Sequence, residues 1–428
     1  MTRPIFRVVV TAGLVALAAC STSAPPVPRA TPPSTTAPLT AAPTASTPAP
    51  TASTPAPTAS APTPTTPATT PAPTPAGSDP VAATLRAMTL EQRVGQLLMV
   101  GGAATGVGQA TWRAVTRHHV GNVMLTGRSS AGVAATARVS AGVRALATRS
   151  ATGGVPPFIA TDQEGGAVQV LRGNGFSKIP SGVVQGGWSS ATLRRRAAQW
   201  GSELHAAGVD LDLAPVADTV TPGAADDNPP IGRFGRQLGS TPDDVGDHVL
   251  AFNAGLRAAG VAATVKHFPG LGRLRANTDV SSGVTDRTTT RRDPALAPFA
   301  RAVDAGVPFV MMSTATYAQI DPTQPAAFSA VVIGQVLRDD LGFDGVVISD
   351  DLGSARQVAS VPPGQRAVRF VAAGGDIVLT VDPDVLPAMQ RALLARARSD
   401  PAFRAAVDAA VTRVLTAKLR QGLLEPRS

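Results

Sequence analysis

The chain has 428 residues, of which 43% are hydrophobic and 16% charged, and its formal net charge is +9 at pH 7. It contains one Cys, so a disulfide within the chain is excluded. Charged residues are rare before residue 79 and frequent after it, which divides the chain into a leader, a spacer and a globular body. Only the body can bury a large hydrophobic core.

Residues 1–19 predict a signal peptide. Arg3 and Arg7 give a cationic start, the run from Val8 to Ala19 is mainly apolar, and Cys20 follows directly. This segment resembles bacterial lipoprotein signals, in which the Cys at this position becomes lipidated. We expect acylated Cys20 to anchor the protein at the cell membrane, on its extracytoplasmic face. A secretory peptide with an incidental Cys is the alternative.

Residues 20–78, which begin with the lipidated Cys, predict a disordered linker. They consist almost entirely of Ala, Pro, Thr and Ser, and TASTPAP occurs twice in tandem at 44–50 and 51–57. Such a composition cannot build a core. Proline at this density favours an extended chain of ~3.1 Å per residue. We expect either a stalk that sets the distance of the body from the membrane or a passive tether.

Residues 79–428 predict an α/β fold, a (β/α)8 barrel of the TIM type. Short apolar runs rich in β-formers alternate here with longer amphipathic stretches. The eight runs are 95–101, 121–125, 157–161, 209–215, 261–266, 308–313, 345–349 and 376–380. Runs that are apolar on both faces and separated by helical patterns indicate a parallel sheet with helices outside it. Eight repeats match the barrel, and a doubly wound open sheet is the alternative.

Charged side chains follow four of the eight runs. The clusters are Asp162 with Glu164, Asp218 with Arg233 and Arg236, Lys266 with His267, and Asp350 with Asp351. In (β/α)8 barrels the chemistry lies at the carboxyl ends of the strands, so we expect these side chains to meet at one rim. Taken singly, each has a simpler explanation as a helix cap, a solvated ion pair or a buried histidine.

Asp350 follows directly on a buried apolar run, which suits a nucleophile. Retaining glycoside hydrolysis needs a carboxylate that attacks the anomeric carbon and a proton donor ~5 Å away. We expect Asp351 to cap the next helix, which leaves Asp350 to face the barrel mouth. Lys266 and His267 could donate hydrogen bonds to sugar hydroxyls, and the Gly-, Ser- and Thr-rich loop 271–284 could close over a substrate.

Three segments together resemble glycoside hydrolase family 3. They are DQEGG at 162–166, KHFPG-x-G at 266–272 and GFDGVVISDDL at 342–352. The resemblance covers about residues 85–425 and is strongest to the single-domain β-N-acetylglucosaminidases that recycle peptidoglycan. The leader and linker resemble a secreted actinobacterial lipoprotein branch of that family.

The resemblance implies retaining hydrolysis of terminal β-linked N-acetylglucosamine from peptidoglycan (muropeptide) fragments, with Asp350 as the nucleophile. It places ligands of the sugar hydroxyls at Asp162, Arg236, Lys266 and His267. Arg233 lies close enough to Arg236 to compete for the same assignment. A second arginine ligand of the family falls here on Val170, and Arg172 could substitute for it.

The largest departure from the family concerns the proton donor. The family pattern KHFPG-x-G-x-x-x-x-Asp-Ser-His supplies a His at the position that is Asp279 here, within Asn277-Thr278-Asp279. A carboxylic acid can protonate a leaving oxygen if burial or a second carboxylate raises its pKa. We therefore predict that Asp279 is the acid/base and that Asn277 orients it.

Other chemistries lack their motifs. No cofactor is implied, and the five His residues form no HExxH metal motif, while GxxxxGK[ST] and GxSxG are also absent from the sequence. The positive charge is scattered along predicted helices, so nucleic-acid binding is not expected, although anionic wall polymers or lipid headgroups could attract the protein. We expect a monomer. The alternatives to the hydrolase are a degenerate barrel that binds glycans without cleaving them, and a family 3 β-glucosidase or phosphorylase.

Overall fold

The computed structural model describes residues 79–424. The predicted signal peptide, the lipidation site Cys20 and the linker to residue 78 lie outside the described residues. Within residues 79–424, no helix is both long enough and apolar enough to cross a membrane.

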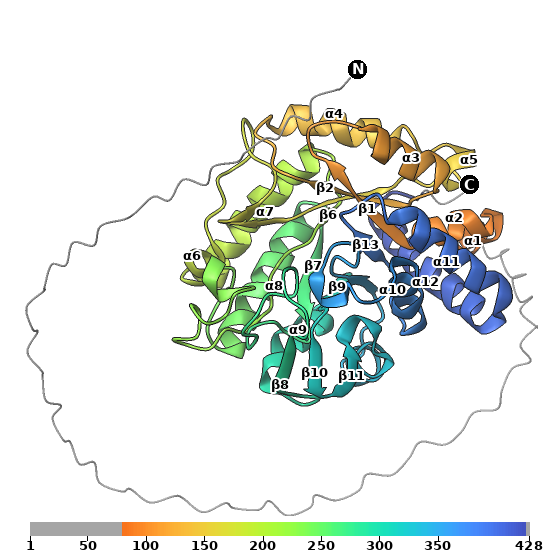
Figure 1. Cartoon of the computed structure of the whole chain (residues 1–428). Coiled ribbons are helices and arrows are strands. Elements are labelled where there is room, and N and C mark those ends of the chain that lie inside the picture. The colour runs from red at the N-terminus through yellow and green to blue at the C-terminus, as the bar shows by residue number, and fades with distance from the viewer. Residues whose placement is uncertain (1–78, 425–428) are drawn as a thin grey trace, which may run out of the picture. The chain divides into compact units, whose positions relative to one another are not determined.

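Eight parallel strands form the centre of the body, in the order in which they follow one another along the chain (Figure 1). They are β1 (Leu98–Ala103), β2 (Asn122–Thr126), β3 (Phe158–Thr161), β6 (Leu211–Asp212), β7 (Ala262–Phe268), β9 (Phe309–Met312), β12 (Val346–Ser349) and β13 (Val378–Thr380). β13 pairs with β1, and a parallel bridge between Ile348 and Ile377 joins β12 to β13. The ring is therefore nearly closed, which confirms the predicted barrel; an open sheet would leave its two outer strands apart.

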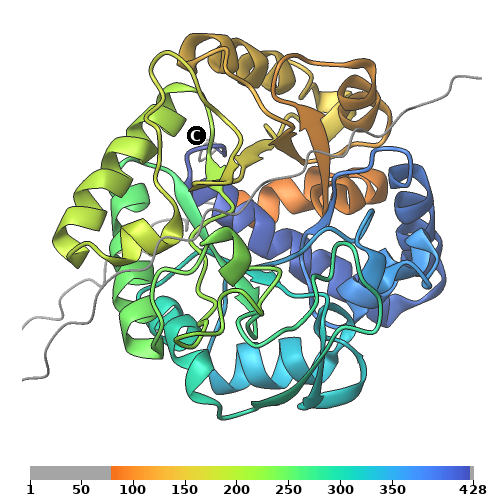
Figure 2. The ribbon, with the colours of Figure 1, turned by 60° about the vertical axis from the view of Figure 1, so that its left-hand side comes forward.

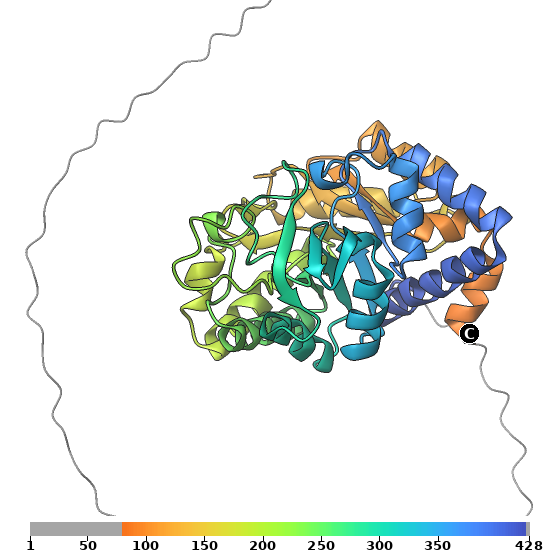
Figure 3. The ribbon, with the colours of Figure 1, turned by 60° about the horizontal axis from the view of Figure 1, so that its bottom comes forward.

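Helices surround the strands. They are α1 (Pro80–Ala87), α2 (Leu90–Gln96), α3 (Gln109–Arg117), α4 (Val133–Arg144), α5 (Arg149–Thr152), α6 (Gly182–Gly186), α7 (Ser190–Ala206), α8 (Pro242–Ala258), α9 (Ala297–Asp304), the π-helix η4 (Val331–Asp340), α10 (Pro363–Ala372), α11 (Leu386–Ser399) and α12 (Pro401–Arg420). The colours in Figure 2 run round the ring in chain order, from orange through green to blue. α1 packs against α12, so the first and last helices lie side by side (Figure 3).

All eight predicted runs supply a barrel strand, but the bounds of the fourth differ. The run 209–215 predicts seven residues, whereas β6 contains only Leu211 and Asp212. Pro215 has no backbone N–H, so a regular ladder cannot continue through it. The chain beyond it touches β7 through an isolated bridge between Val216 and Lys266.

Two small sheets are formed by short strands in the connections that follow barrel strands. After β3, β4 (Gln163–Gly165) and β5 (Val168–Gln169) form an antiparallel hairpin. A three-stranded sheet of β8 (Thr285–Thr290), β10 (Thr316–Gln319) and β11 (Asp321–Pro325) lies at the bottom of Figure 1 and comes forward in Figure 3. The hairpin and the connection after β7 carry residues of the site described below.

A buried lysine ties three strands together at the opposite end of the barrel. Lys418 on α12 is fully buried, and its Nζ donates to Gln96 Oε1, Gly121 O and Pro156 O at 2.8, 2.7 and 2.9 Å. These acceptors immediately precede β1, β2 and β3. Burial lowers the pKa of Lys418 to about 7, while three acceptors match the three protons of an ammonium group. At this end of the barrel, Lys418 therefore serves to hold the starts of the strands together.

Candidate active site

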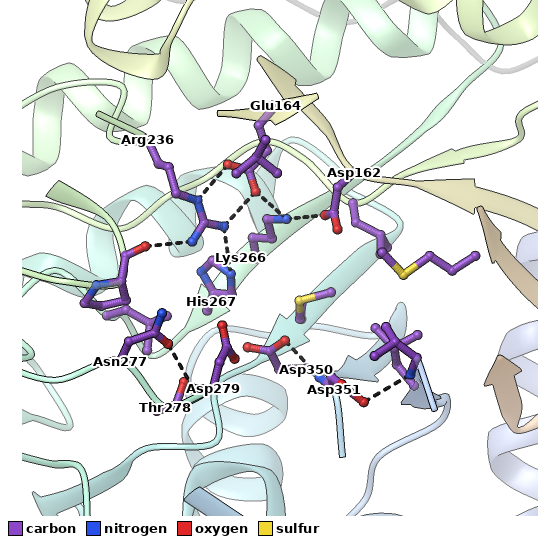
Figure 4. Close-up of a pocket in the computed structure, with 18 residues that line it drawn as sticks. Asp162, Glu164, Arg236, Lys266, His267, Asn277, Thr278, Asp279, Asp350 and Asp351 are labelled. Carbon is purple, nitrogen blue, oxygen red and sulfur yellow. Dashed lines mark hydrogen bonds and ion pairs between the residues drawn. The ribbon is translucent and has the colours of Figure 1, made fainter. Parts of the chain in front are cut away.

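A cavity of about 310 Å³ opens at the carboxyl ends of the barrel strands (Figure 4). Its wall contains six of the predicted site residues: Asp162, Arg236, Lys266, His267, Asp279 and Asp350. They come from five different connections or strand ends, so only the folded barrel brings them together. This arrangement agrees with the prediction that charged side chains from several strands meet at one rim of the barrel.

Lys266 lies at the centre of the polar wall. It belongs to β7, is 2% exposed, and its Nζ lies 2.7 Å from Asp162 Oδ1 and 2.6 Å from Glu164 Oε1. Burial opposes the charge, but the two carboxylates outweigh it and raise the pKa of Lys266 above its ordinary value. Lys266 is therefore a fixed cation that holds Asp162 at the cavity surface.

Glu164 forms a second ion pair, with Arg236. Arg236 Nε and Nη2 donate to the two carboxylate oxygens of Glu164 at 2.9 and 2.7 Å, and Nη1 donates to Pro230 O at 2.8 Å. Although burial opposes ionisation, Arg236 and Lys266 hold the pKa of Glu164 well below its usual range. The ambiguity between two arginines is thereby resolved in position: Arg236 lines the cavity, whereas Arg233 is exposed and donates to Asp226 O.

The imidazole of His267 is fixed from behind by Asp218. His267 Nδ1 lies 2.7 Å from Asp218 Oδ2, and Asp218 Oδ1 accepts the backbone N–H groups of His267 and Leu271 at 3.2 and 2.7 Å. Asp218 is fully buried. The other ring nitrogen, Nε2, lies 3.4 Å from Arg236 Nη2 at the cavity wall. His267 is thus buried, at 4% exposure, and is at the same time an oriented polar group of the cavity wall.

Asp350 follows β12 and projects into the cavity opposite these cations. Its Oδ1 accepts the backbone N–H of Asp351 at 2.8 Å. Burial raises the pKa of Asp350 to about 6; His267 and Lys266 oppose this rise, and the carboxylate of Asp279 adds to it. Asp350 is therefore ionised near neutral pH, and it is only weakly stabilised by hydrogen bonds.

Asp351 does not cap a helix, contrary to the sequence-based expectation. Its Oδ1 accepts the backbone N–H groups of Gly353 and Val381 at 2.8 and 3.1 Å. The next α-helix, α10, begins only at Pro363. Asp351 instead closes the turn after β12 and ties it to the end of β13, which fixes the backbone on which Asp350 stands.

Asp279 reaches the cavity from the connection after β7. Figure 4 shows its carboxylate beside that of Asp350. Asn277 Oδ1 accepts the backbone N–H of Asp279 at 2.9 Å, so Asn277 orders the turn and does not contact the carboxyl group. Backbone N–H groups of Arg356 and Gln357 donate to the carbonyls of Asp279 and Thr278, both at 3.0 Å. The segment that could close as a lid is therefore fastened to the chain after β12.

The structure places Arg172 outside the cavity wall. Its Nε donates to Gln169 O and its Nη2 to Gly166 O, both at 3.2 Å, so the guanidinium braces the β4–β5 hairpin. Val170, at the position of the family's arginine, does not line the cavity either. The proposed substitution by Arg172 therefore has no support in this geometry, because Arg172 does not line the cavity and its Nε and Nη2 donate to the backbone of the hairpin.

A further carboxyl group lies beneath the ion pairs and was not singled out in the sequence. Asp212 of β6 is 1% exposed, and its Oδ1 accepts the backbone N–H of Gln163 at 2.9 Å. Burial raises the pKa of Asp212 to about 8, with a further contribution from Asp162 and Glu164. Burial thus favours the uncharged form of Asp212, and its side chain helps to hold the start of the hairpin.

Sequence reasoning assigned no role to Glu164 or Asp218, although both follow predicted strands. The sequence shows that both residues follow strands. It does not show that Glu164 pairs with Arg236 or Asp218 with His267, because each partner follows or belongs to a different strand. Within residues 79–424, no group of three or more His, Cys, Asp and Glu side chains is arranged to hold a metal ion.

Comparison with known proteins decides the class. The model of the glycosyl hydrolase family 3 N-terminal domain matches residues 89–417. The chain belongs to glycoside hydrolase family 3. The family inferred from the three sequence segments is confirmed, and so is the prediction that the protein is an enzyme of the hydrolase class.

Family 3 relatives resemble the chain over most of its length. A β-N-acetylhexosaminidase structure from Beutenbergia cavernae DSM 12333 is 53% identical, with a TM-score of 0.77, over 77% of this chain and 98% of that chain. A family 3 β-N-acetylglucosaminidase structure from Paenibacillus sp. str. FPU-7 is 31% identical, with a TM-score of 0.70, over 78% and 63% of the two chains. A β-hexosaminidase from Xanthomonas campestris pv. campestris (strain B100) is 33% identical over 316 residues, which are 70% of this chain and 88% of the relative.

Proposed function

We propose that this family 3 enzyme is a retaining exo-β-N-acetylglucosaminidase with Asp350 as nucleophile and Asp279 as acid/base. The observation that carries the proposal is that these two carboxyl groups share one cavity, opposite a wall of oriented hydrogen-bond donors. The names of the relatives, β-N-acetylhexosaminidase and β-N-acetylglucosaminidase, support the same activity.

The proposed reaction has two displacement steps. Asp350 attacks the anomeric carbon as the bond to the leaving oxygen breaks, and Asp279 gives its proton to that oxygen. This forms an ester between the sugar and Asp350. Asp279, now ionised, removes a proton from water, and the resulting hydroxide displaces Asp350 from the anomeric carbon with net retention.

Burial and charge suit these two roles. Desolvation makes the Asp350 carboxylate more reactive as a nucleophile than a hydrated one, and its raised pKa still leaves it ionised at pH 7. Asp279 is exposed at the cavity and lies beside Asp350, where a carboxyl group can exchange a proton with the leaving oxygen and with water.

The remaining wall suits a single terminal sugar. Asp162, Lys266, His267 and Arg236 form a continuous set of donors and acceptors that is locked by Glu164 and Asp218. Such a rigid, charged wall binds hydroxyl groups in one orientation, because its members do not reorganise when substrate enters. A cavity of about 310 Å³ that is closed below by the barrel core supports removal of one residue from a chain end.

The wider role is also part of the proposal. We take muropeptide fragments of the cell wall as the substrate, and cell-wall turnover as the process, on the strength of the sequence resemblance. Acylation of Cys20 would place the enzyme at the extracytoplasmic face of the membrane, as a monomer on a linker.

The decisive test is release of 4-nitrophenol from 4-nitrophenyl N-acetyl-β-glucosaminide. Wild type should turn over this substrate and discriminate against the β-glucoside, while Asp350→Ala should lose at least about 10³-fold in kcat/KM. Asp304→Ala, at an exposed Asp of α9 that does not line the cavity, is the matched control and should keep wild-type kcat/KM. Labelling by a fluorinated N-acetylglucosaminide should map to Asp350.

Three outcomes would contradict parts of the proposal. Binding of N-acetylglucosamine with equal background release by wild type and Asp350→Ala would indicate the non-cleaving barrel. Equal rates on glucoside and N-acetylglucosaminide would indicate a β-glucosidase. A sugar phosphate product that requires inorganic phosphate would indicate a phosphorylase.

A further inference from the structure

A second concave site lies on the side wall of the barrel, between α7 and α8. It is a cleft of about 350 Å³, which we call the arginine cleft, formed by Arg194, Arg195, Ala198, Ala254, Arg257 and Ala258. The three arginines are exposed, and the alanines provide a floor of small side chains. Both helices start at the catalytic end of the barrel, but none of these six residues lines the active-site cavity.

The cleft exists because small residues let the two helices approach closely. A Cβ atom on Gly255 would lie 2.6 Å from Arg194 O and from Ala197 Cβ, and one on Gly201 would lie 2.8 Å from Ala259 Cβ. With no larger side chain between the helices, arginines from both helices border the same narrow space. The small residues between α7 and α8 thus allow the guanidinium groups of both helices to lie close together.

The arginines of the cleft have no carboxylate partner. None of the three forms an ion pair with any residue between 79 and 424; Arg195 donates to Thr192 Oγ1, and Arg257 to Ala305 O. Of the acids on these helices, Glu203 accepts from Ser177, Asp244 accepts from Thr241 and Asp247 pairs with Arg301. Asp243 lies in the first turn of α8, at the opposite end of that helix from Arg257. Grouped guanidinium groups repel one another and are stabilised by an external anion.

The basic surface continues across α7 into a second hollow. Its wall contains Ser177, Lys178, Pro180, Trp188, Arg196 and Trp200. Lys178 and Arg196 are exposed and also lack a carboxylate within ion-pair distance among the described residues. Trp188 is partly exposed and packs on Trp200, with ring centroids 6.3 Å apart. An aromatic ring beside cations suits a sugar ring that carries or adjoins an anionic group.

We propose that the arginine cleft and the adjoining hollow form a binding site for an anionic glycan chain whose repeating phosphate or carboxylate groups pair with Arg194, Arg195 and Arg257. Guanidinium groups bind both anions through two parallel hydrogen bonds. The site is separate from the catalytic cavity, so a bound polymer holds the enzyme among its substrates without occupying the active site.

The shape of the surface favours a polymer over a membrane. Helices that bind a membrane surface insert large apolar side chains between the headgroups. The exposed large apolar residues of the described chain are Val107, Val183, Val184, Phe234, Val280 and Val381, and none belongs to α7 or α8. The arginine cleft is concave, has an alanine floor and contains none of these side chains, so it can hold a chain but cannot insert into lipid. Val183 and Val184 lie on α6, next to the adjoining hollow in the sequence.

The test compares two triple variants of the full chain in a Cys20→Ser background, so that no acyl chain contributes to binding. Arg194→Gln/Arg195→Gln/Arg257→Gln removes the three positive charges of the arginine cleft. The control is Arg113→Gln/Arg138→Gln/Arg391→Gln, three exposed arginines of α3, α4 and α11 that also lack ion pairs in residues 79–424. Both variants lower the net charge by the same amount. Binding to poly(glycerol phosphate), polygalacturonate and neutral pullulan is measured by affinity electrophoresis.

The cleft variant should bind at least one of the two anionic polymers about tenfold or more weakly than wild type, and the control variant within about twofold. The polymer that loses binding identifies phosphate or carboxylate as the anion. Both variants should hydrolyse the aryl glycoside normally, and Asp350→Asn should bind polymer normally, which separates this proposal from the proposed hydrolysis. Equal losses in both triple variants, equal binding of pullulan, or a loss confined to phosphatidylglycerol vesicles would overturn it.

Discussion

Asn277 holds the backbone of Asp279 and not its carboxyl group: the Oδ1 of Asn277 accepts the main-chain N–H of Asp279 at 2.9 Å. The acid therefore receives no charge partner from its own turn. Its carboxylate acts instead on Asp350, the group with which it shares the cavity, and adds to the rise in the pKa of Asp350. The charge on the proposed proton donor thus influences the nucleophile.

Replacing the acid should discriminate between leaving groups. Asp279→Asn removes the proton that a sugar leaving group needs, so we expect a loss of about 10² to 10⁴-fold in kcat/KM on a disaccharide. On the 4-nitrophenyl glycoside, whose leaving group needs little protonation, the loss should be much smaller. Steady-state kinetics on both substrates checks this. Full turnover of the disaccharide by Asp279→Asn would show that another group donates the proton.

Replacing the nucleophile should stabilise the fold. The pKa of Asp350 is about 6 in the folded protein and 3.8 in its ordinary state, so the folded form binds a proton between these pH values that the unfolded form has released. The ionised carboxylate therefore lowers the free energy of unfolding above pH 6 and has no such effect below pH 3.8.

Asp350→Asn should accordingly raise that free energy at pH 7 by up to ~3 kcal/mol, with no gain near pH 3.5. Denaturant titration at the two pH values measures it. In wild type, kcat/KM should rise with pH through about 6 as Asp350 ionises. If Asp350→Asn were less stable than wild type at pH 7, the ionised carboxylate of Asp350 would not be destabilising the folded protein.

Glu164 is expected to act through the two cations that it binds. Glu164→Gln leaves Arg236 and Lys266 without their shared carboxylate, which should cost roughly 2–5 kcal/mol of stability and lower kcat/KM by about 10²-fold. Glu203→Gln on α7, which lies away from the cavity, is the control and should keep kcat/KM. Thermal unfolding and kinetics are measured on the same samples. Wild-type KM and kcat in Glu164→Gln would remove the positioning role.

Lys418 is expected to be essential for stability and irrelevant to catalysis. Lys418→Met leaves Gln96 Oε1, Gly121 O and Pro156 O without their donor in a buried space, and should lower the free energy of unfolding by about 2–4 kcal/mol. Lys178→Met, on the surface, should change it by less than about 0.5 kcal/mol. Folded Lys418→Met should keep its kcat below its unfolding temperature; a lowered kcat in folded protein would refute the division between the two barrel ends.

Much of the fold was visible in the sequence because the barrel strands are buried on both faces. Continuous apolar runs such as 345–349 mark such strands without any need for alternation. The error at β6 has a local cause, since Pro215, the partly buried Asp210 and the buried Asp212 interrupt an otherwise apolar run. The charged residues that follow the predicted strands correctly indicated where the cavity lies.

The parts of the site that sequence could not supply are pairings across strands. Glu164 with Arg236 and Asp218 with His267 join residues that are 72 and 49 positions apart. Spacing along the chain carries no sign of such partners. Arg172 misled for the related reason that its position depends on the bend of the β4–β5 hairpin, which turns its guanidinium onto backbone carbonyls.

The backbone hydrogen bonds from Arg356 and Gln357 to Asp279 and Thr278 join two connections that leave different barrel strands. The distance between the carboxyl groups of Asp279 and Asp350 therefore depends on both the connection after β7 and the connection after β12. Lengthening or shortening one of them would move the acid relative to the nucleophile unless the other changed in step. Natural variants of this enzyme should accordingly inherit the lengths of these two segments as a pair.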